Sequence, residues 1–305
     1  HQVFCVQGKR GGVKRHSEKL IIGFSWFGMT MLLFAVASII GYLCMKGYSS
    51  LDVLLIFGDT AALDALLLRK QVFNGLFPAI AGTLVLVVMS VVWAIPVGIA
   101  TGIYLAEYAN TRIKGVFNLF FDVLAGIPSI VIGLFGFALA VFLHKHFSRT
   151  IQPCLLLSSV ALAFLVLPYL IRTTQMALEG LPESTRLGAL ALGATKLQNI
   201  YYVLLPKSLS GIMSGVILAI GRCAEDTAVI MLTGVVASAG VPRSLLSSYE
   251  ALPFYIYYIS SQYTGPEELL TGYAASIILL AICIVLFSAA FLIKKRLTYI
   301  AFYRT

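Results

Sequence analysis

The chain has 305 residues, of which 59% are hydrophobic and only 11% are charged, with 22 Lys and Arg against 13 Asp and Glu. Soluble globular domains carry about 25% charged residues, so this sequence has too little charge to cover a water-facing surface of its size. The composition excludes a cytosolic enzyme, a nucleic-acid-binding domain and a disordered scaffold. It indicates an integral membrane protein that crosses the bilayer several times.

A helix needs about 20 apolar residues to cross the hydrocarbon core of a bilayer, and six segments reach this length. In chain order they are residues 20–45, 76–106, 117–143, 154–178, 208–235 and 269–293. Lipid offers no hydrogen-bond partners to the backbone, so each segment is predicted to be helical. The predicted fold class is therefore all-α, a bundle of six transmembrane helices.

An even number of spans places both ends of the chain on one side of the membrane. Most of the Lys and Arg residues lie in the two tails and in the second and fourth connections. By the positive-inside rule, these regions are predicted to be cytoplasmic.

Several predicted spans contain proline, namely Pro96, Pro128 and Pro168. Membrane helices tolerate proline because neighbouring helices satisfy the freed backbone groups. The pattern fits kinked helices in close contact, and it also fits helices broken around a translocation path.

The connection between the fourth and fifth spans, residues 179–206, is polar at its start and then regularly apolar. Pro182 and Glu183 suit the first turn of a helix, Gly193 interrupts it, and Thr195 with Gln198 forms the pattern of a capping box that starts a second helix. The stretch is predicted to be a helix–Gly–helix elbow at the membrane surface. It is either an amphipathic connection or a docking site for a cytoplasmic partner.

The predicted fifth span contains Arg222, Glu225 and Asp226, followed by Thr227. The three charged residues share one helix face, and each costs at least about 2.5–3.5 kcal/mol inside the bilayer. They form either an internal salt bridge or a polar gate on an anion pathway. If both acids are ionised the cluster carries a net negative charge, so a gate needs one protonated acid or a further cation from a partner.

No pattern for enzymatic chemistry is present. The sequence lacks Gly-x-x-x-x-Gly-Lys-[Ser/Thr], His-Glu-x-x-His and Gly-x-Ser-x-Gly, and its five cysteines contain no Cys-x-x-Cys. We predict no catalytic centre, no metal site and no bound cofactor in this chain.

The elbow resembles the coupling loop of bacterial ABC importer permeases, known as the EAA loop. Leu187-Gly188-Ala189 stands at the Glu-Ala-Ala of that motif, Gly193 is in register, and Leu205-Pro206 follows Ile200. The resemblance covers roughly residues 76–293 and implies the type I ABC importer permease fold. It assigns ATPase coupling to Arg186, Gly188, Ala189, Gly193, Ala194, Thr195, Lys196 and Pro206.

Residues 82–109, 122–139 and 221–234 are similar to phosphate-specific importer permeases, and residues 252–260 favour the A-type subunit over the C-type. Where that family has Arg-x-x-Gly-Glu-Thr-Ala, this chain has Glu225 for Gly and Asp226 for Glu. The resemblance implies a substrate pathway or gate at Arg222, Glu225, Asp226 and Thr227. It also implies a homologous permease as pseudo-dimer partner, two ATPase subunits that bind ATP and Mg, and a periplasmic phosphate-binding protein.

In the inner membrane of a prokaryote, these predictions divide the chain into five parts. They are a basic cytoplasmic tail (1–19), a first span (20–45), a periplasmic loop (46–75), a permease core (76–293) with its elbow (179–206), and a cytoplasmic tail (294–305). Two alternatives remain: the same architecture for another oxyanion such as molybdate or sulfate, and an ion-coupled secondary transporter in which Glu225 and Asp226 relay protons.

Overall fold

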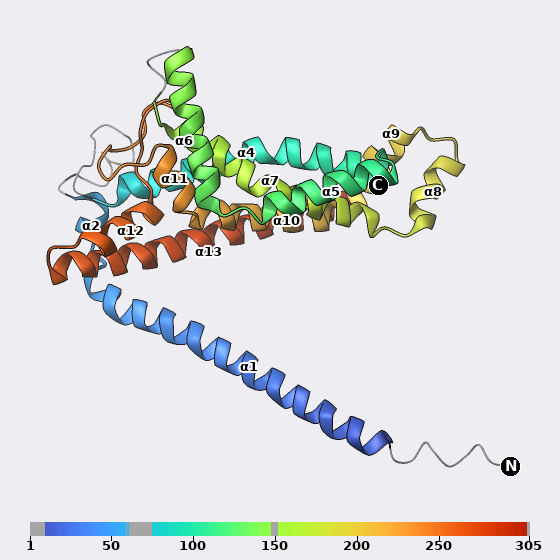
Figure 1. Ribbon diagram of the computed structural model, residues 1–305, viewed down its shortest axis with the longest axis horizontal. Helices are drawn as coiled ribbons and strands as arrows, with labels where there is room; N and C mark the ends of the chain where they lie inside the picture. Colours follow the sequence, from blue (N-terminus) through green and yellow to red (C-terminus); the bar gives the residue numbers. More distant parts are fainter. Residues whose placement is uncertain (1–9, 59, 61–74, 148–151, 304–305) are drawn as a thin grey trace.

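The computed structural model describes residues 10–58, 60, 75–147 and 152–303 (Figure 1). Six helical stretches in these ranges are long and apolar enough to cross a membrane. They are Glu18–Ser50, Phe77–Glu107, Ser129–His146, Leu155–Glu179, Lys196–Glu225 and Pro266–Ile300. The prediction of a six-span, all-α bundle is confirmed.

The helices in chain order are α1 (Arg10–Gly47), η1 (Tyr48–Ser50), α2 (Val53–Phe57), α4 (Phe77–Glu107), α5 (Thr111–Ala125), α6 (Ser129–His146), α7 (Leu155–Glu179), α8 (Glu183–Ala191), α9 (Lys196–Asn199), η2 (Ile200–Leu204), α10 (Leu205–Glu225), α11 (Ala228–Thr233), α12 (Leu252–Gln262) and α13 (Pro266–Tyr303). Residues 1–9 of the predicted N-terminal tail lie outside the described residues, and α1 begins within this tail at Arg10. Residues 59 and 61–74 of the predicted periplasmic loop also lie outside them, whereas α13 continues into the predicted C-terminal tail.

Helix α7 is the most buried of the candidate spans and forms the centre of the bundle. A Cβ added to Gly102 of α4 would come within 2.6 Å of the Cβ of Thr174 on α7, so the two backbones approach closely there. Pro96 and Pro168 lie inside the uninterrupted helices α4 and α7. Close packing rather than helix breaking therefore describes these two positions.

The third span is shorter than predicted. Instead of one helix over residues 117–143, α5 ends at Ala125 and α6 begins at Ser129. Pro128 disfavours helical geometry at Ile127 and has no N–H for the helix ladder, which explains the break. Only α6 is a candidate span, while α5 leaves Phe117, Phe120 and other apolar side chains exposed.

The fifth span was also predicted with the wrong extent. Helix α10 ends at Glu225, and Asp226 has an extended conformation with φ −75° and ψ 115°. The short helix α11 then follows as a separate element. The predicted continuous helix over residues 208–235 is therefore two helices, and the charged cluster lies at the break between them.

Residues 234–251, between α11 and α12, fold back into the bundle. Glu250 accepts hydrogen bonds from the N–H groups of Ala239 (2.8 Å) and Gly240 (2.7 Å) through Oε1, and Leu252 N–H donates to Thr83 Oγ1 of α4 at 2.9 Å. Burial raises the pKa of the Glu250 carboxyl, and the two N–H donors act in the opposite direction. Residues 234–251 are thus held on the start of α4.

Helix α1 diverges from the rest of the bundle (Figure 1). Its side chains are exposed almost throughout from residue 18, and its contact with α13 is at its C-terminal end, where the Tyr42 and Tyr273 rings pack edge to face with centroids 5.9 Å apart. The start of α1 and the end of α13 lie toward the same end of the molecule as α8 and α9.

Candidate functional site

The elbow between α7 and α10 has the predicted local structure. Gly193 follows α8 with φ +86°, a backbone region that L side chains rarely adopt. Thr195 Oγ1 accepts the N–H of Gln198 at 3.3 Å, and Gln198 Oε1 accepts the N–H of Thr195 at 2.8 Å. The predicted helix, glycine turn and capping box are confirmed.

The carbonyl of Ala189 closes the turn by accepting the N–H groups of Leu192 (3.2 Å) and Ala194 (3.1 Å). Beyond the turn, Pro206 lies in the first turn of α10, immediately after the π-helical turn η2. A proline lacks the N–H of the helix ladder and crowds the preceding turn, and a π turn accommodates both effects. The second arm of the elbow therefore runs without a gap into the fifth span.

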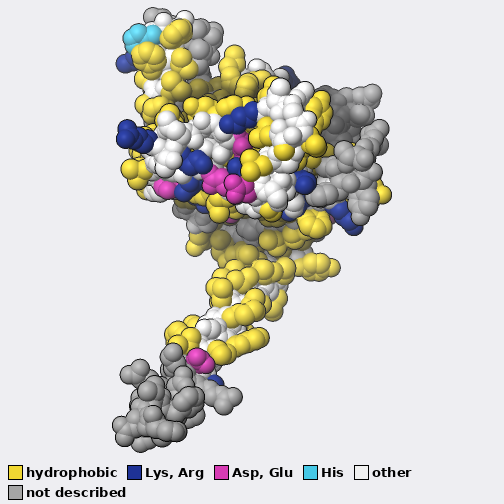
Figure 2. Space-filling view, turned by 90° about the vertical axis from the view of Figure 1, so that its right-hand side faces the viewer, with side chains coloured by type: hydrophobic (Ala, Val, Ile, Leu, Met, Phe, Trp, Pro, Cys, Tyr) yellow, Lys and Arg dark blue, Asp and Glu magenta, His cyan; other side chains and the backbone are white. Residues whose placement is uncertain are grey.

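The outer face of the elbow is apolar and exposed. Leu187 is 52% exposed, Leu192 90% and Leu197 69%, and a Cβ added to Gly188 would meet nothing within 4 Å. Figure 2 views this end of the molecule, where Lys, Arg, Asp and Glu side chains gather among hydrophobic ones. An exposed apolar surface that is bordered by charged side chains is suited to docking another protein.

The inner face of the elbow is held to the end of α4. Arg186 Nη2 lies 3.0 Å from Glu107 Oε1 and donates to the carbonyl of Leu178 at 2.7 Å. Lys196 donates to the carbonyl of Glu107 and lies over the ring of Tyr108, 4.6 Å from its centroid. The sequence did not point to Glu107, because its partners follow it by 79 residues or more and leave no local pattern.

The charged cluster lies at the far end of α10. Arg222 Nη1 is 3.3 Å from Glu225 Oε1, and Arg222 Nη2 is 3.8 Å from Asp226 Oδ2. Asp226 Oδ1 also accepts the N–H of Val229 at 3.0 Å. The Asp226 side chain is 4% exposed and that of Glu225 is 63% exposed, so the two acids have different environments.

Thr227, the last predicted residue of the gate, starts α11 through its backbone: its carbonyl accepts the N–H of Met231 at 3.0 Å in the first turn of that helix. Among the described residues, the buried Nε of Arg222 has no hydrogen-bond partner. One donor of the guanidinium is therefore buried and unpaired, although the group faces two carboxylates.

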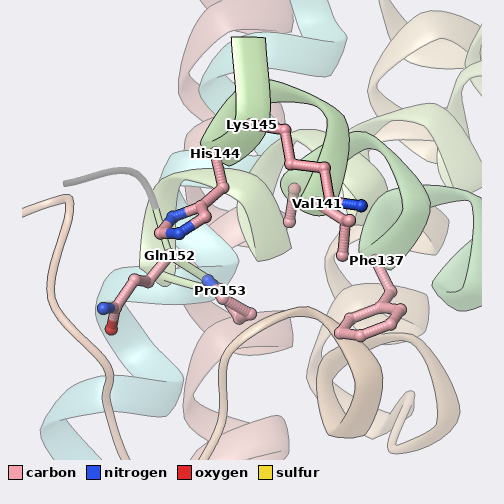
Figure 3. Close-up of a pocket in the computed structure, with 7 residues that line it drawn as sticks. Phe137, Val141, His144, Lys145, Gln152 and Pro153 are labelled. Atoms are coloured by element: carbon pink, nitrogen blue, oxygen red, sulfur yellow. The ribbon is translucent and has the colours of Figure 1, made fainter. Parts of the chain in front are cut away.

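The two predicted sites are separate. Arg222 lies 17 residues beyond the start of α10, which corresponds to about 25 Å along the helix. A cavity of about 220 Å³ near the end of α6 contains none of the predicted site residues; its lining is Phe137, Ala140, Val141, His144, Lys145, Gln152 and Pro153 (Figure 3). Helix α10 joins the elbow to the charged cluster.

A six-span helical bundle with an elbow between its fourth and fifth spans defines the permease subunit of a type I ABC importer. The chain matches the family described as "Binding-protein-dependent transport system inner membrane component" over residues 98–299, and it belongs to this family. The matched range contains the elbow and the charged cluster. The chain is therefore an inner-membrane transport component and not an enzyme; in this class, a separate subunit hydrolyses ATP.

The most similar relatives include "Phosphate transport system permease protein PstA" of Haemophilus influenzae, 31% identical over 285 residues that cover 93% of this chain and 96% of the relative. The protein with the same name from Yersinia pestis is 40% identical over 161 residues, or 52% of each chain. Among solved structures, the inward-facing MetNI methionine ABC transporter has a TM-score of 0.52 at 19% identity and covers 78% of this chain and 100% of its own. The last likeness concerns the fold alone.

Proposed function

We propose that this chain is a PstA-type permease subunit that passes inorganic phosphate through the cytoplasmic membrane. The observation that carries the proposal is the similarity over 93% of the chain to a permease named for phosphate transport. The substrate crosses along a path lined by the permease spans, and ATP hydrolysis on other subunits drives the movement.

The chain works within a larger complex. A homologous permease pairs with it as a pseudo-dimer, two copies of an ATPase subunit bind ATP and Mg, and a periplasmic phosphate-binding protein delivers the substrate. The exposed leucines of the elbow support the docking of an ATPase subunit there.

Both termini and the elbow face the cytoplasm in this proposal. The start of α1, the end of α13 and the elbow lie toward one end of the molecule, which supports a common side (Figure 1). A membrane-impermeant thiol reagent added from the periplasmic side should label a cysteine placed at Thr60 and miss one placed at Gly193. Labelling of position 193 from outside would overturn the topology and the docking of the ATPase together.

Arg222, Glu225, Asp226 and Thr227 form the gate of the phosphate path. Arg222 and Glu225 lie at the end of the apolar length of the fifth span, and Asp226 and Thr227 follow it directly. The side chain of Arg222 is 40% exposed and supplies donors for an oxyanion. A guanidinium suits phosphate because its planar fork donates two parallel hydrogen bonds. Asp226 holds Arg222 in place from the buried side, and the exposed Glu225 faces the path.

Reconstitution tests the function. The complex of both permeases and the ATPase is placed in proteoliposomes with the binding protein, and uptake of radiolabelled phosphate is followed with and without ATP. We expect ATP-dependent uptake that unlabelled phosphate abolishes and an excess of molybdate or sulfate leaves unchanged. Competition by molybdate or sulfate alone would assign another oxyanion, and uptake driven by a proton gradient without ATP would indicate a secondary transporter.

A further inference from the structure

We propose that Glu107 is a positioning residue that fixes both arms of the elbow to the end of α4, so that movement of the ATPase reaches α4 as well as α10. The inference rests on the proposed function and adds a second route of transmission to it. Glu107 is the last residue of α4. It lies in the segment 82–109 that resembles phosphate-specific importer permeases, and that resemblance assigns it no role.

Glu107 contacts both arms of the elbow at once. Its carboxylate pairs with Arg186 of α8 at 3.0 Å, and its backbone carbonyl accepts the ammonium of Lys196 from α9. Asn199 Nδ2 donates to the carbonyl of Arg186 at 2.8 Å, which closes the link between the two arms. The elbow is therefore tied to α4 on either side of its glycine turn.

This ion pair is more enclosed than the other pairs near the cytoplasmic end. The side chains of Glu107 and Arg186 are 10% and 25% exposed, whereas those of Asp122 and Arg172 are 56% and 34% exposed. Exposed pairs add little because solvent screens them, and an enclosed pair resists separation more strongly because its charges have lost water. Of these two pairs, the Glu107 pair is the better suited to transmit a displacement.

Apolar contacts reinforce the same joint. Ala106, next to Glu107, packs in one buried cluster with Leu178 of α7 and with Ile200 and Leu204 of η2. The carboxylate joins the end of α4 to α8, and this cluster joins it to the turn that precedes α10. Two independent kinds of contact therefore fix the elbow to α4.

Helix α4 then links the elbow to the segment at residues 234–251. The helix has 31 residues without a break, which corresponds to about 46 Å. Near its start, Thr83 accepts the N–H of Leu252, and Gly82 leaves no room for a side chain beside the carbonyl of Glu250. A tilt imposed on α4 at Glu107 would therefore act on this segment.

A double-mutant cycle tests the role of Glu107. Glu107→Gln keeps the shape of the side chain and removes its charge, Arg186→Gln removes the partner, and the double variant removes both. The measured quantity is ATP hydrolysed per phosphate imported by the reconstituted complex. We expect Glu107→Gln to raise this ratio roughly fivefold, and the double variant to equal Arg186→Gln because the two residues act as one unit. A ratio like that of the parent, or effects of the single variants that simply multiply, would overturn the proposal.

Two controls separate coupling from folding. Asp122→Asn breaks the more exposed pair with Arg172 and should leave the ratio unchanged; an equal rise there would also overturn the proposal. The amount of assembled complex is measured for every variant. If Glu107→Gln does not assemble, the swap Glu107→Arg with Arg186→Glu is compared with Glu107→Arg alone. Recovery in the swap supports the pair, and no recovery overturns it. Absence of ATP-driven phosphate uptake by the parent complex would reject the proposed function itself.

Discussion

The helices are interrupted on both sides of α10, at the Gly193 turn before it and at Asp226 after it. Different interactions determine the two interruptions. At the elbow, a Cβ on Gly193 would meet nothing within 4 Å, so only the backbone conformation at φ +86° restricts the residue. At the break after Glu225, the buried Asp226 is held by Arg222 and by the N–H of Val229. The backbone conformation of Gly193 determines the elbow turn, and the buried charge of Asp226 determines the break. Different substitutions should therefore disrupt each of them.

The largest effect is expected at Arg222. Arg222→Ala leaves the buried Asp226 without its counter-charge and removes the guanidinium donors from the proposed gate. We expect phosphate uptake to be abolished. Arg222→Lys keeps the charge and loses the planar fork, so it should also lose most uptake if the guanidinium binds phosphate.

The measurement is uptake by reconstituted complex, normalised to the amount of permease in the membrane. Transport by Arg222→Lys at the parental rate would limit Arg222 to the role of counter-ion. Transport by Arg222→Ala at the parental rate would make the whole cluster structural and place the phosphate path elsewhere.

The next largest effect should come from Gly193→Val. A β-branched residue at φ +86° costs on the order of 1–3 kcal/mol, so the turn must change shape. We expect ATP hydrolysis to continue with little uptake, while the complex still assembles because the spans are unaltered. Gly115→Val is the matched control, since Gly115 lies in α5 and also has nothing within 4 Å of its Cβ position but needs no positive φ. Equal effects of the two substitutions would remove the special role of the elbow turn.

A smaller effect separates the two acids at the break. Asp226→Asn removes the charge that faces Arg222 while its Oδ1 can still accept the N–H of Val229, and Glu225→Gln changes a side chain that is 63% exposed. A buried charge contributes more than a screened one, so Asp226→Asn should lower uptake roughly tenfold and Glu225→Gln less than about twofold. The reverse order would show that the exposed acid performs the gating step.

The sequence predicted the elbow well and the break poorly, for a physical reason. The elbow is determined by backbone geometry within a few residues, at Pro182, Gly193 and the Thr195–Gln198 pair. A local sequence pattern can therefore predict it. Hydropathy does not predict where α5 and α10 end, because apolar residues continue beyond Gly126–Pro128 and beyond Asp226. The contacts of Glu107 with Arg186 and Lys196 are made by packing of distant segments, which no local pattern reports.

The smallest effect is expected at Thr195, the N-cap of α9. Thr195→Ala removes the side-chain acceptor for the N–H of Gln198, and loss of such a cap costs about 1 kcal/mol. We expect amide hydrogen exchange at residues 196–199 to become about fivefold faster, with a smaller change in ATP hydrolysed per phosphate than Gly193→Val causes. Thr195→Ser keeps the hydroxyl and should exchange like the parent. If Thr195→Ala uncouples the complex as severely as Gly193→Val, the second helix start and not the glycine conformation sets the geometry of the elbow. The contrast with the break at Asp226 would then fail, because a side chain that accepts a backbone N–H would set the geometry at both sites.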